Sequence, residues 1–400
     1  MTTRLAWKNI WRNKTRSLIF IGAAFFGLAL AIFTINLMKG IAAQRLDDAV
    51  SIQTGHLQIQ NKDFNTFREI DQYIADPAQV RALLKDQPQI VSITERMVSE
   101  AVLTTPENTS IAQLTGVKPE IEIQFSALKD YLIGGTFLEG DLPKPILVSK
   151  KTAERLKLSI RSKVIVTLKA VSGEIVGGAF RVSGIFETPN TPYDENNAIV
   201  KYSDLGELSG IRNPHEIAIL VNDRMQLTRI EGFLVKNLPS DYRHYSWITL
   251  LPQLYAFNGF TEAVSMLFTI IILLGLGFGL LNTMNMIVQE RTREIGMLRA
   301  IGQSKWSVFF MLVKESGFLM FIGSLTGILL GIVIVNMTSQ TGVPLGSGFA
   351  LLGIRATIYP VVVWPMIVMV CVLATMLTAI ISVFPAFRAL RIRPHAALRD

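Results

Sequence analysis

Four long apolar runs, separated by polar segments of very unequal length, dominate the hydropathy pattern of this chain. A helix needs about 20 mostly apolar residues to cross the hydrocarbon core of a bilayer. The runs that reach this length are Leu18–Leu37, Ala263–Val288, Phe309–Val335 and Val361–Phe384. A long stretch of mixed composition lies between the first and second runs. The pattern predicts an α-helical membrane protein with four transmembrane helices and one large domain between helices 1 and 2.

The distribution of Lys and Arg predicts which side of the membrane each polar segment occupies, because cytoplasmic loops are enriched in these residues. Cations cluster before the first run, between the second and third runs, and after the fourth run. The connection between the third and fourth runs contains Arg355 as its only cation. All three basic segments fall on one side if every run spans. We therefore predict that both termini are cytoplasmic and that the large domain is extracytoplasmic.

These predictions divide the chain into segments with defined bounds. They are a cytoplasmic amphipathic helix at 1–17, membrane helices at 18–39, 259–288, 309–336 and 361–384, the extracytoplasmic domain at 40–258, a cytoplasmic connection at 289–308, a short external loop at 337–360, and a cytoplasmic tail at 385–400.

Composition changes this picture little. The formal charge of +8 raises the question of a nucleic-acid partner. However, the cations gather at the membrane edges, which is typical of topology signals and of contacts with lipid headgroups, so we expect membrane lipid and no nucleic acid. The one cysteine, Cys371, lies inside the fourth run. The extracytoplasmic domain must therefore be held together by its core without disulfide bonds.

The extracytoplasmic domain has a mixed α/β pattern. Gly55–Gln60 alternates between apolar and polar residues as a half-buried strand does. Asp76 followed by Pro77 is typical of a helix start. Strands are also predicted at Ile90–Thr105 and Ser110–Val117, and strand patterns are densest over about 125–202. We predict that this strand-rich stretch is inserted into the rest of the domain.

Candidate catalytic chemistry is sparse. The four histidines, at positions 56, 215, 244 and 395, lack the spacing of metal ligands, and no catalytic or P-loop motif occurs. Gly275-Leu276-Gly277-Phe278-Gly279 imitates a phosphate-binding loop but lies within an apolar run. We expect no catalytic residue, no metal and no cofactor bound by this chain, so the energy for any transport comes from another subunit.

Glycines recur at a spacing that permits close helix packing. Gly323, Gly327 and Gly331 lie four residues apart in the third run, and Gly275 and Gly279 do so in the second. Small residues at this spacing let another helix approach closely. The pattern does not decide whether that helix belongs to the same subunit or to a second one.

The connection between the second and third runs carries the most specific pattern. Residues 289–302 contain Ile295, Leu298 and Ile301 as a narrow apolar stripe on a charged helix, followed by Gly302 as a helix end. Such a helix can lie on lipid or dock into another protein, and the residues alone favour neither.

Four stretches resemble the MacB/FtsX superfamily of ABC-transporter permeases, which includes the lipoprotein-releasing (Lol-type) permeases. Glu290–Gly302 resembles the family's cytoplasmic signature, and Leu5–Lys14 resembles its N-terminal elbow. Phe180–Phe186 resembles an extracytoplasmic strand of the family, and Pro385–Arg399 resembles its C-terminal ending. The resemblance covers essentially the whole chain.

The resemblance implies a dimer of permease subunits, alike or unlike, that works with two copies of a P-loop ATPase, in a bacterial inner membrane. ATP and Mg²⁺ would then bind in the ATPase. The segment between helices 2 and 3 would be the coupling helix, with Ile295 and Leu298 filling an apolar cleft of the ATPase. Its ATPase-coupling residues would be Glu290, Arg293, Glu294, Ile295, Leu298, Arg299 and Gly302. The domain would have a porter-like part split between Gly40–Phe125 and Ser203–Asn258.

One departure from the family concerns handover to an outside partner. Lol-type members that pass lipoproteins to a periplasmic chaperone have a protruding loop before the strand that Phe180–Phe186 resembles, whereas Val171–Gly178 is only a short turn. The loop containing Pro189, Asn190, Pro192 and Tyr193 is a possible substitute contact site for a periplasmic partner or chaperone, although two prolines in a loop are more often turn chemistry.

The sequence thus predicts a permease that uses a partner's ATP hydrolysis to extract or transport a lipophilic or lipid-anchored substrate at the outer leaflet. One alternative is mechanotransmission, in which the extracytoplasmic domain drives a periplasmic partner. A membrane-anchored enzyme or sensor is a third possibility, against which the missing catalytic motifs argue.

Overall fold

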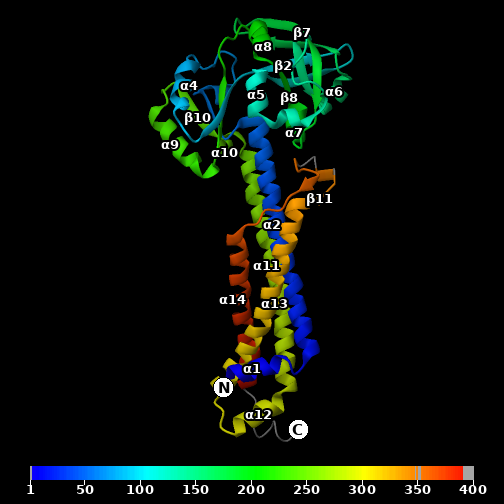
Figure 1. Ribbon diagram of the computed structural model, residues 1–400, viewed down its shortest axis with the longest axis vertical. Helices are drawn as coiled ribbons and strands as arrows, with labels where there is room; N and C mark the ends of the chain where they lie inside the picture. The colour runs from blue at the N-terminus through cyan, green and yellow to red at the C-terminus, as the bar shows by residue number, and fades with distance from the viewer. Residues whose placement is uncertain (1, 347, 350–352, 391–400) are drawn as a thin grey trace. The chain divides into compact units, whose positions relative to one another are not determined.

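The computed structural model describes residues 2–346, 348–349 and 353–390, and the chain forms two compact units (Figure 1). The first, here called the membrane unit, comprises Met1–Ala42, Phe257–Pro344 and Thr357–Asp400. The second, here called the arm, comprises Ala43–Ala256 and Leu345–Ala356. The arm therefore includes part of the connection between the third and fourth apolar runs, in addition to the long stretch between the first and second.

The membrane unit is helical. Its helices are α1 (Thr2–Ile10), α2 (Lys14–Ala49, which continues into the arm), α11 (Pro252–Glu290), α12 (Thr292–Ala300), α13 (Lys305–Thr341) and α14 (Trp364–Leu390). Among the described residues, four helices are long and apolar enough to cross a membrane, namely α2 with its π-helical end η1 (Val50–Thr54), α11, α13 and α14. A short pairing of β11 (Val343–Pro344) with β12 (Thr357–Ile358) lies between α13 and α14.

Several helix bounds differ from the prediction. The N-terminal helix was expected over 1–17, but α1 ends at Ile10 and α2 begins at Lys14. Ser17 closes this corner, because its hydroxyl donates a hydrogen bond to the Ile10 carbonyl at 2.6 Å. The fourth membrane helix was expected to end at 384, yet α14 continues through Pro385 to Leu390. The remainder of the predicted tail, 391–400, lies outside the described residues.

The arm is built on a mixed sheet with ten strands among the described residues. The strands are β1 (Leu57–Asn61), β2 (Ile90–Thr104), β3 (Thr109–Val117), β4 (Leu132–Gly135), β5 (Pro145–Ser149), β6 (Lys163–Lys169), β7 (Ile175–Phe186), β8 (Asn197–Lys201), β9 (Glu216–Val221) and β10 (Tyr242–Ser246). Their order is β10-β1-β9-β2-β3-β8-β5-β7-β4, and β6 pairs with β2 and β7. This mixed α/β architecture is the predicted fold class.

Short helices pack on this sheet or connect its strands. They are α3 (Phe64–Phe67), α4 (Pro77–Lys85), α5 (Pro119–Phe125), α6 (Lys150–Leu156), α7 (Thr191–Asn196), α8 (Tyr202–Ser209), α9 (Leu227–Asn237) and α10 (Trp247–Leu250), with 3₁₀ turns η2 (Ala127–Tyr131) and η3 (Arg224–Gln226). The start of α4 shows why the sequence folds in this way. Asp76 accepts a hydrogen bond from the Gln79 backbone N–H at 3.0 Å, and Pro77 occupies the first turn, where no intrahelical donor is needed.

The long strand β2 divides the arm into two parts. Its first half, Ile90–Arg96, pairs with β9, and its second half, Met97–Thr104, pairs with β3. The first part contains β1, β9 and β10 with α4 and α9 around its own apolar core. The second part contains the remaining strands around two further clusters. The strand-rich part therefore begins near Met97, and the predicted start near residue 125 was too late.

Candidate functional site

The apolar residues that α12 and the residue after it expose are not the ones that the sequence indicated. Ile295 is buried, with 2% of its surface exposed, and belongs to the core of the membrane unit. Leu298 is half-buried, whereas Met297 and Ile301 are 46% and 80% exposed. The prediction that Ile295 fills a partner's cleft conflicts with this burial, since its side chain is already enclosed by its own subunit. The exposed apolar residues of the segment are Met297 and Ile301.

Three arginine–glutamate pairs fix α12 and the two residues before it, Glu290 and Arg291, within the membrane unit. Arg12, which follows α1, donates from both terminal nitrogens to Glu294, and the Nη1–Oε2 distance is 2.8 Å. Arg16 binds Glu290 in the same two-pronged manner, with Nη1–Oε2 at 2.7 Å. Parallel contacts of this kind hold both partners in one geometry.

The third pair lies deeper. Arg291 Nη1 donates to both carboxylate oxygens of Glu315 on α13, at 3.2 and 3.0 Å. The Glu315 side chain is only 2% exposed and that of Arg291 is 11% exposed. A buried charge of this kind is stable only when it is paired. The residue that joins α11 to α12 is therefore tied directly to the next membrane helix.

The other predicted coupling residues occupy varied environments. Hydrogen bonds from Arg12 hold the pKa of the Glu294 carboxyl below its ordinary value. Arg299 donates from Nη1 to the Leu390 carbonyl at 3.2 Å, so it joins α12 to the end of α14. Gly302 follows the helix with a φ of +96°, a left-handed conformation that favours glycine. The side chain of Arg293 is exposed.

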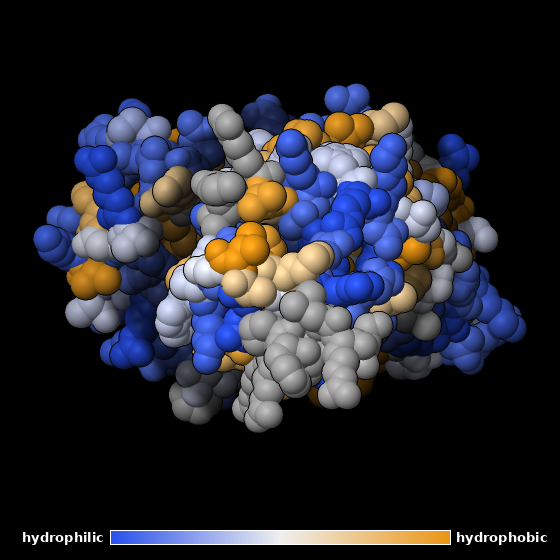
Figure 2. Space-filling model, turned by 90° about the horizontal axis from the view of Figure 1, so that it is seen from below, coloured by the Kyte–Doolittle hydropathy of each residue, from blue (hydrophilic) through white to orange (hydrophobic). Residues whose placement is uncertain are grey.

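An apolar cavity of about 300 Å³ opens beside α12. Leu5 of α1 and Met311 and Leu312 of α13 form one side, and Met297, Leu298 and Ile301 form another. Figure 2 views the molecule from the end at which α12 lies and shows apolar side chains gathered next to strongly hydrophilic ones. A cavity with apolar walls and a charged border is suited to receive an apolar side chain of another protein.

The glycines of α13 lie against α2. A Cβ added at Gly327 would lie 2.5 Å from the Phe25 carbonyl oxygen, and one at Gly323 would lie 2.6 Å from the Ala24 Cβ. At Gly331 the corresponding distance to the Ile32 Cβ is 3.0 Å. These three positions therefore adjoin a helix of the same chain. Across the part of the chain that the structure describes, no atom of another helix lies within 4 Å of a Cβ built at Gly275 or at Gly279.

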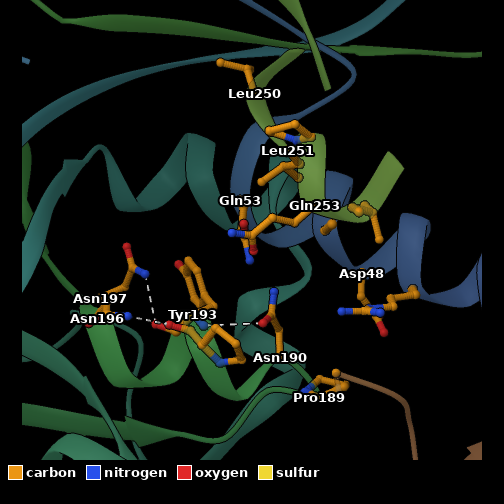
Figure 3. A pocket seen from close by; sticks show the side chains of 16 residues that line it. Asp48, Gln53, Pro189, Asn190, Tyr193, Asn196, Asn197, Leu250, Leu251 and Gln253 are labelled. Atoms are coloured by element: carbon orange, nitrogen blue, oxygen red, sulfur yellow. Dashed lines mark hydrogen bonds between the residues drawn. The ribbon is translucent and has the colours of Figure 1, made fainter. Parts of the chain in front are cut away.

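The proposed contact loop of the arm is partly helical. Pro192 lies in the first turn of α7, and Asn190 caps this helix by accepting a hydrogen bond from the Tyr193 N–H at 3.4 Å. Pro189, Asn190, Pro192 and Tyr193 all line one cavity of about 370 Å³ within the arm. Figure 3 shows Gln53, Asn190, Tyr193 and Gln253 around this space. The prolines thus shape a helix start and the wall of a cavity.

A second, more polar cavity of about 160 Å³ lies in the arm and shares Gln53, Tyr193 and Asn197 with the first. Its wall includes the buried ion pair of Arg96 and Glu122, whose Nη2–Oε1 distance is 2.5 Å. Both side chains are about 5% exposed or less. No group of His, Cys, Asp and Glu side chains able to hold a metal occurs among the residues that the structure describes.

Sequence reasoning missed the partners of the predicted glutamates. Arg12, Arg16 and Glu315 were not identified as part of the α12 region, nor was Met297. Glu315 did carry a signal, because a carboxylate within an apolar run requires a partner. Arg12 and Arg16 carried no such signal beyond their charge, because their partners lie more than 270 positions away in the sequence.

The chain is similar to ABC-transporter permeases of the type that includes MacB, FtsX and LolC. Its described residues contain four membrane-type helices, with an α/β arm between the first two in the sequence. Residues 266–394 match the family described as FtsX-like permease C-terminal, and over this stretch the chain is an FtsX-like permease domain.

Relatives of the same type extend the similarity to the arm. The lipoprotein-releasing system transmembrane protein LolC of Xylella fastidiosa is 25% identical over 334 residues, covering 80% of each chain. The macrolide export ATP-binding/permease protein MacB of Campylobacter jejuni is 22% identical, covering 99% of this chain and 60% of MacB. Among solved structures, the periplasmic region of MacB from Actinobacillus actinomycetemcomitans is 16% identical with a TM-score of 0.36, covering 53% of this chain and 98% of that region.

Proposed function

We propose that this chain is the permease subunit of an ABC transporter complex in which a separate ATPase subunit supplies the energy. The substrate is a lipophilic or lipid-anchored molecule that is extracted or transported at the outer leaflet of the inner membrane. The observation that carries the proposal is α12, which exposes apolar residues and is held by ion pairs of Glu294 and of the two residues before the helix, Glu290 and Arg291.

The docking surface consists of Arg293, Met297 and Ile301. These residues lie four apart and therefore share one helical face. Met297 and Ile301 border the apolar cavity, which accommodates a side chain of the ATPase, and Arg293 adds an exposed cation on the same helical face. Glu294 of α12 is paired with Arg12, and the two residues that precede α12, Glu290 and Arg291, are paired with Arg16 and Glu315. A force on this surface is therefore transmitted to the surrounding helices.

The remaining parts of the complex follow from this assignment. ATP and Mg²⁺ bind in the P-loop ATPase, a second permease subunit completes the complex, and α12 and both termini face the cytoplasm. The substrate class is supported by the similarity to LolC, whose name describes a lipoprotein-releasing system.

Mechanotransmission is the alternative function, in which the arm drives a periplasmic partner and nothing crosses the membrane. The continuous strand β2 favours it, because one strand pairs with both parts of the arm. A displacement of one part therefore reaches the other through a single rigid element.

The docking surface is tested by the double variant Met297→Glu/Ile301→Glu, produced together with the ATPase and purified in mild detergent. Truncating or charging a buried anchor costs about 2 kcal/mol of binding or more, so ATPase co-purification should fall at least tenfold. Met225→Glu is a matched control, because Met225 is an apolar residue on the arm with 89% of its surface exposed. Full ATPase retention in the double variant would contradict the coupling role of α12.

Glu294→Lys is a less selective test than the sequence suggested. Glu294 already binds Arg12 within the chain, so this substitution disrupts the membrane unit as well as any contact with the ATPase. Orientation is tested separately by reporters. A fusion after Asp223 should behave as extracytoplasmic and one after Gln303 as cytoplasmic, and the opposite result at either site would contradict the proposed topology.

A further inference from the structure

The connection between α13 and α14 is partly incorporated into the arm. Residues 345–356 group with the arm, although α13 precedes them and α14 follows them in the sequence. The Leu345 N–H donates to the Ala356 carbonyl at 2.8 Å, which draws the two ends of this segment together. The middle of the short external loop predicted over 337–360 therefore belongs to the arm, whereas its first residues are still part of α13 and its last ones belong to the membrane unit.

Arg355 binds two residues of the arm that lie far from it in the sequence. Its Nε donates to the Asp48 carboxylate oxygens at 2.9 and 3.2 Å, and Nη2 donates to the same carboxylate and to the Tyr131 hydroxyl at 3.1 Å. The Tyr131 hydroxyl donates in turn to Asp48 Oδ1 at 3.1 Å. All three side chains are therefore joined to one another.

The three residues come from separate segments. Asp48 lies at the end of α2, Tyr131 ends η2 in the strand-rich part, and Arg355 belongs to the connection between α13 and α14. The cluster is consequently the place at which this connection is attached to both α2 and the strand-rich part of the arm.

Because Asp48 is buried, its carboxylate depends on the ion pair with Arg355. The Asp48 side chain is only 5% exposed and that of Arg355 is 36% exposed. A carboxylate at this depth requires a cation and hydrogen-bond donors, and removing the cation leaves it unpaired. Burial, together with the neighbouring Asp48, raises the pKa of Tyr131 to about 12, so the tyrosine remains a donor at neutral pH.

We propose that Arg355 is a positioning residue for energy coupling. Held by Asp48 and Tyr131, it conveys displacements of the chain between α13 and α14 to the strand-rich part of the arm, in addition to the path through α2 and α11. This inference rests on the proposed ABC-permease function, because it concerns how nucleotide-driven movement reaches the arm.

The test measures hydrogen–deuterium exchange in the full complex with its ATPase, in the nucleotide-free state and after trapping with ATP and vanadate. In the wild-type complex, trapping should change the exchange of residues 345–356 and of η2. In Arg355→Gln and in Asp48→Asn, the nucleotide-dependent change at η2 should be lost, whereas the change around α12 should persist. Arg355→Lys, which retains the positive charge, should preserve part of the response.

Two controls separate coupling from folding. Lys150→Gln removes an exposed ion pair with Glu187 elsewhere in the arm and should leave the response unchanged. The double variant Asp48→Asn/Arg355→Gln removes the unpaired buried charge, so it should fold even if Arg355→Gln does not, and it should still lack the response at η2.

The outcomes are distinguishable. A double variant that is folded and retains the full nucleotide-dependent change at η2 would show that the cluster has only a structural role, and would overturn this inference while leaving the proposed function intact. Failure of the wild-type chain to associate with any ATPase would overturn the proposed function and, with it, this inference.

Discussion

Arg96 lies at the junction of the two halves of β2, and its replacement by methionine should destabilise the arm strongly. The side chain donates to Glu122 at 2.5 and 3.3 Å, donates to the Gln53 carbonyl, and lies over the Phe125 ring at 5.3 Å from its centroid. Methionine fills similar space but leaves the Glu122 carboxylate buried with only the Thr94 hydroxyl, at 2.8 Å, among these contacts.

The expected loss follows from the burial of both partners. Breaking a buried ion pair by removing one member costs about 3–5 kcal/mol, because the other charge is left without compensation. For a domain of this size, each kcal/mol lowers the unfolding midpoint by about 2–4 °C, so the midpoint should fall by roughly 6–20 °C. Thermal unfolding of the full-length protein in detergent, followed by far-ultraviolet circular dichroism, measures this change.

A second variant distinguishes the unpaired charge from lost packing. In Arg96→Met/Glu122→Met the buried carboxylate is absent, so most of the lost stability should return. A loss below about 1 kcal/mol in the single variant, or a double variant no more stable than the single one, would refute this reasoning.

Two further predictions concern helix packing and pH. Gly327→Leu should force α2 and α13 apart and lower the thermal stability of the chain in detergent, whereas Gly275→Leu should leave the stability of the single subunit nearly unchanged; equal stability of both variants would contradict the packing. Burial raises the pKa of the Asp194 carboxyl to about 6, despite hydrogen bonds from Thr188. The folded state therefore binds this proton more tightly than the unfolded state, and its contribution to stability is present below about pH 4 and lost as the pH rises through 6. In Asp194→Asn, the change in the free energy of unfolding between pH 4 and pH 7 should be smaller than in the wild type by about 2 kcal/mol. Denaturant titrations at several pH values measure this free energy, and a variant whose pH dependence runs parallel to that of the wild type would contradict the assignment.

The sequence predicted the membrane helices and the arm's fold class because both depend on local patterns. Apolar length identifies a spanning helix, and alternation identifies strands such as β2, whose observed bounds agree closely with the predicted ones. The bounds of the strand-rich part depend instead on long-range pairing. β3 pairs with β8, which follows it only after four other strands of the arm, and no local pattern specifies that partner.

The face of α12 was only partly predictable, for a geometric reason. A stripe of residues three apart drifts around a helix of 3.6 residues per turn, so Ile295 and Ile301 point roughly 120° apart. One end of the stripe is therefore buried and the other is exposed, although the sequence suggested one continuous face. The ion pairs of Glu290 and Glu294 depend on tertiary contacts with the elbow and were not predictable from these residues.

The shared strand β2 has a consequence for engineering the arm. Exchanging the strand-rich part between related permeases requires a cut where Arg96, paired with Glu216, is followed by Met97, paired with Gly116. A cut within the first half of β2 would remove hydrogen-bond partners from β9 and expose its edge to pairing with other chains. Chimeras joined after residue 96 and near Ile211 preserve that edge, whereas chimeras joined within the first half of β2 should aggregate.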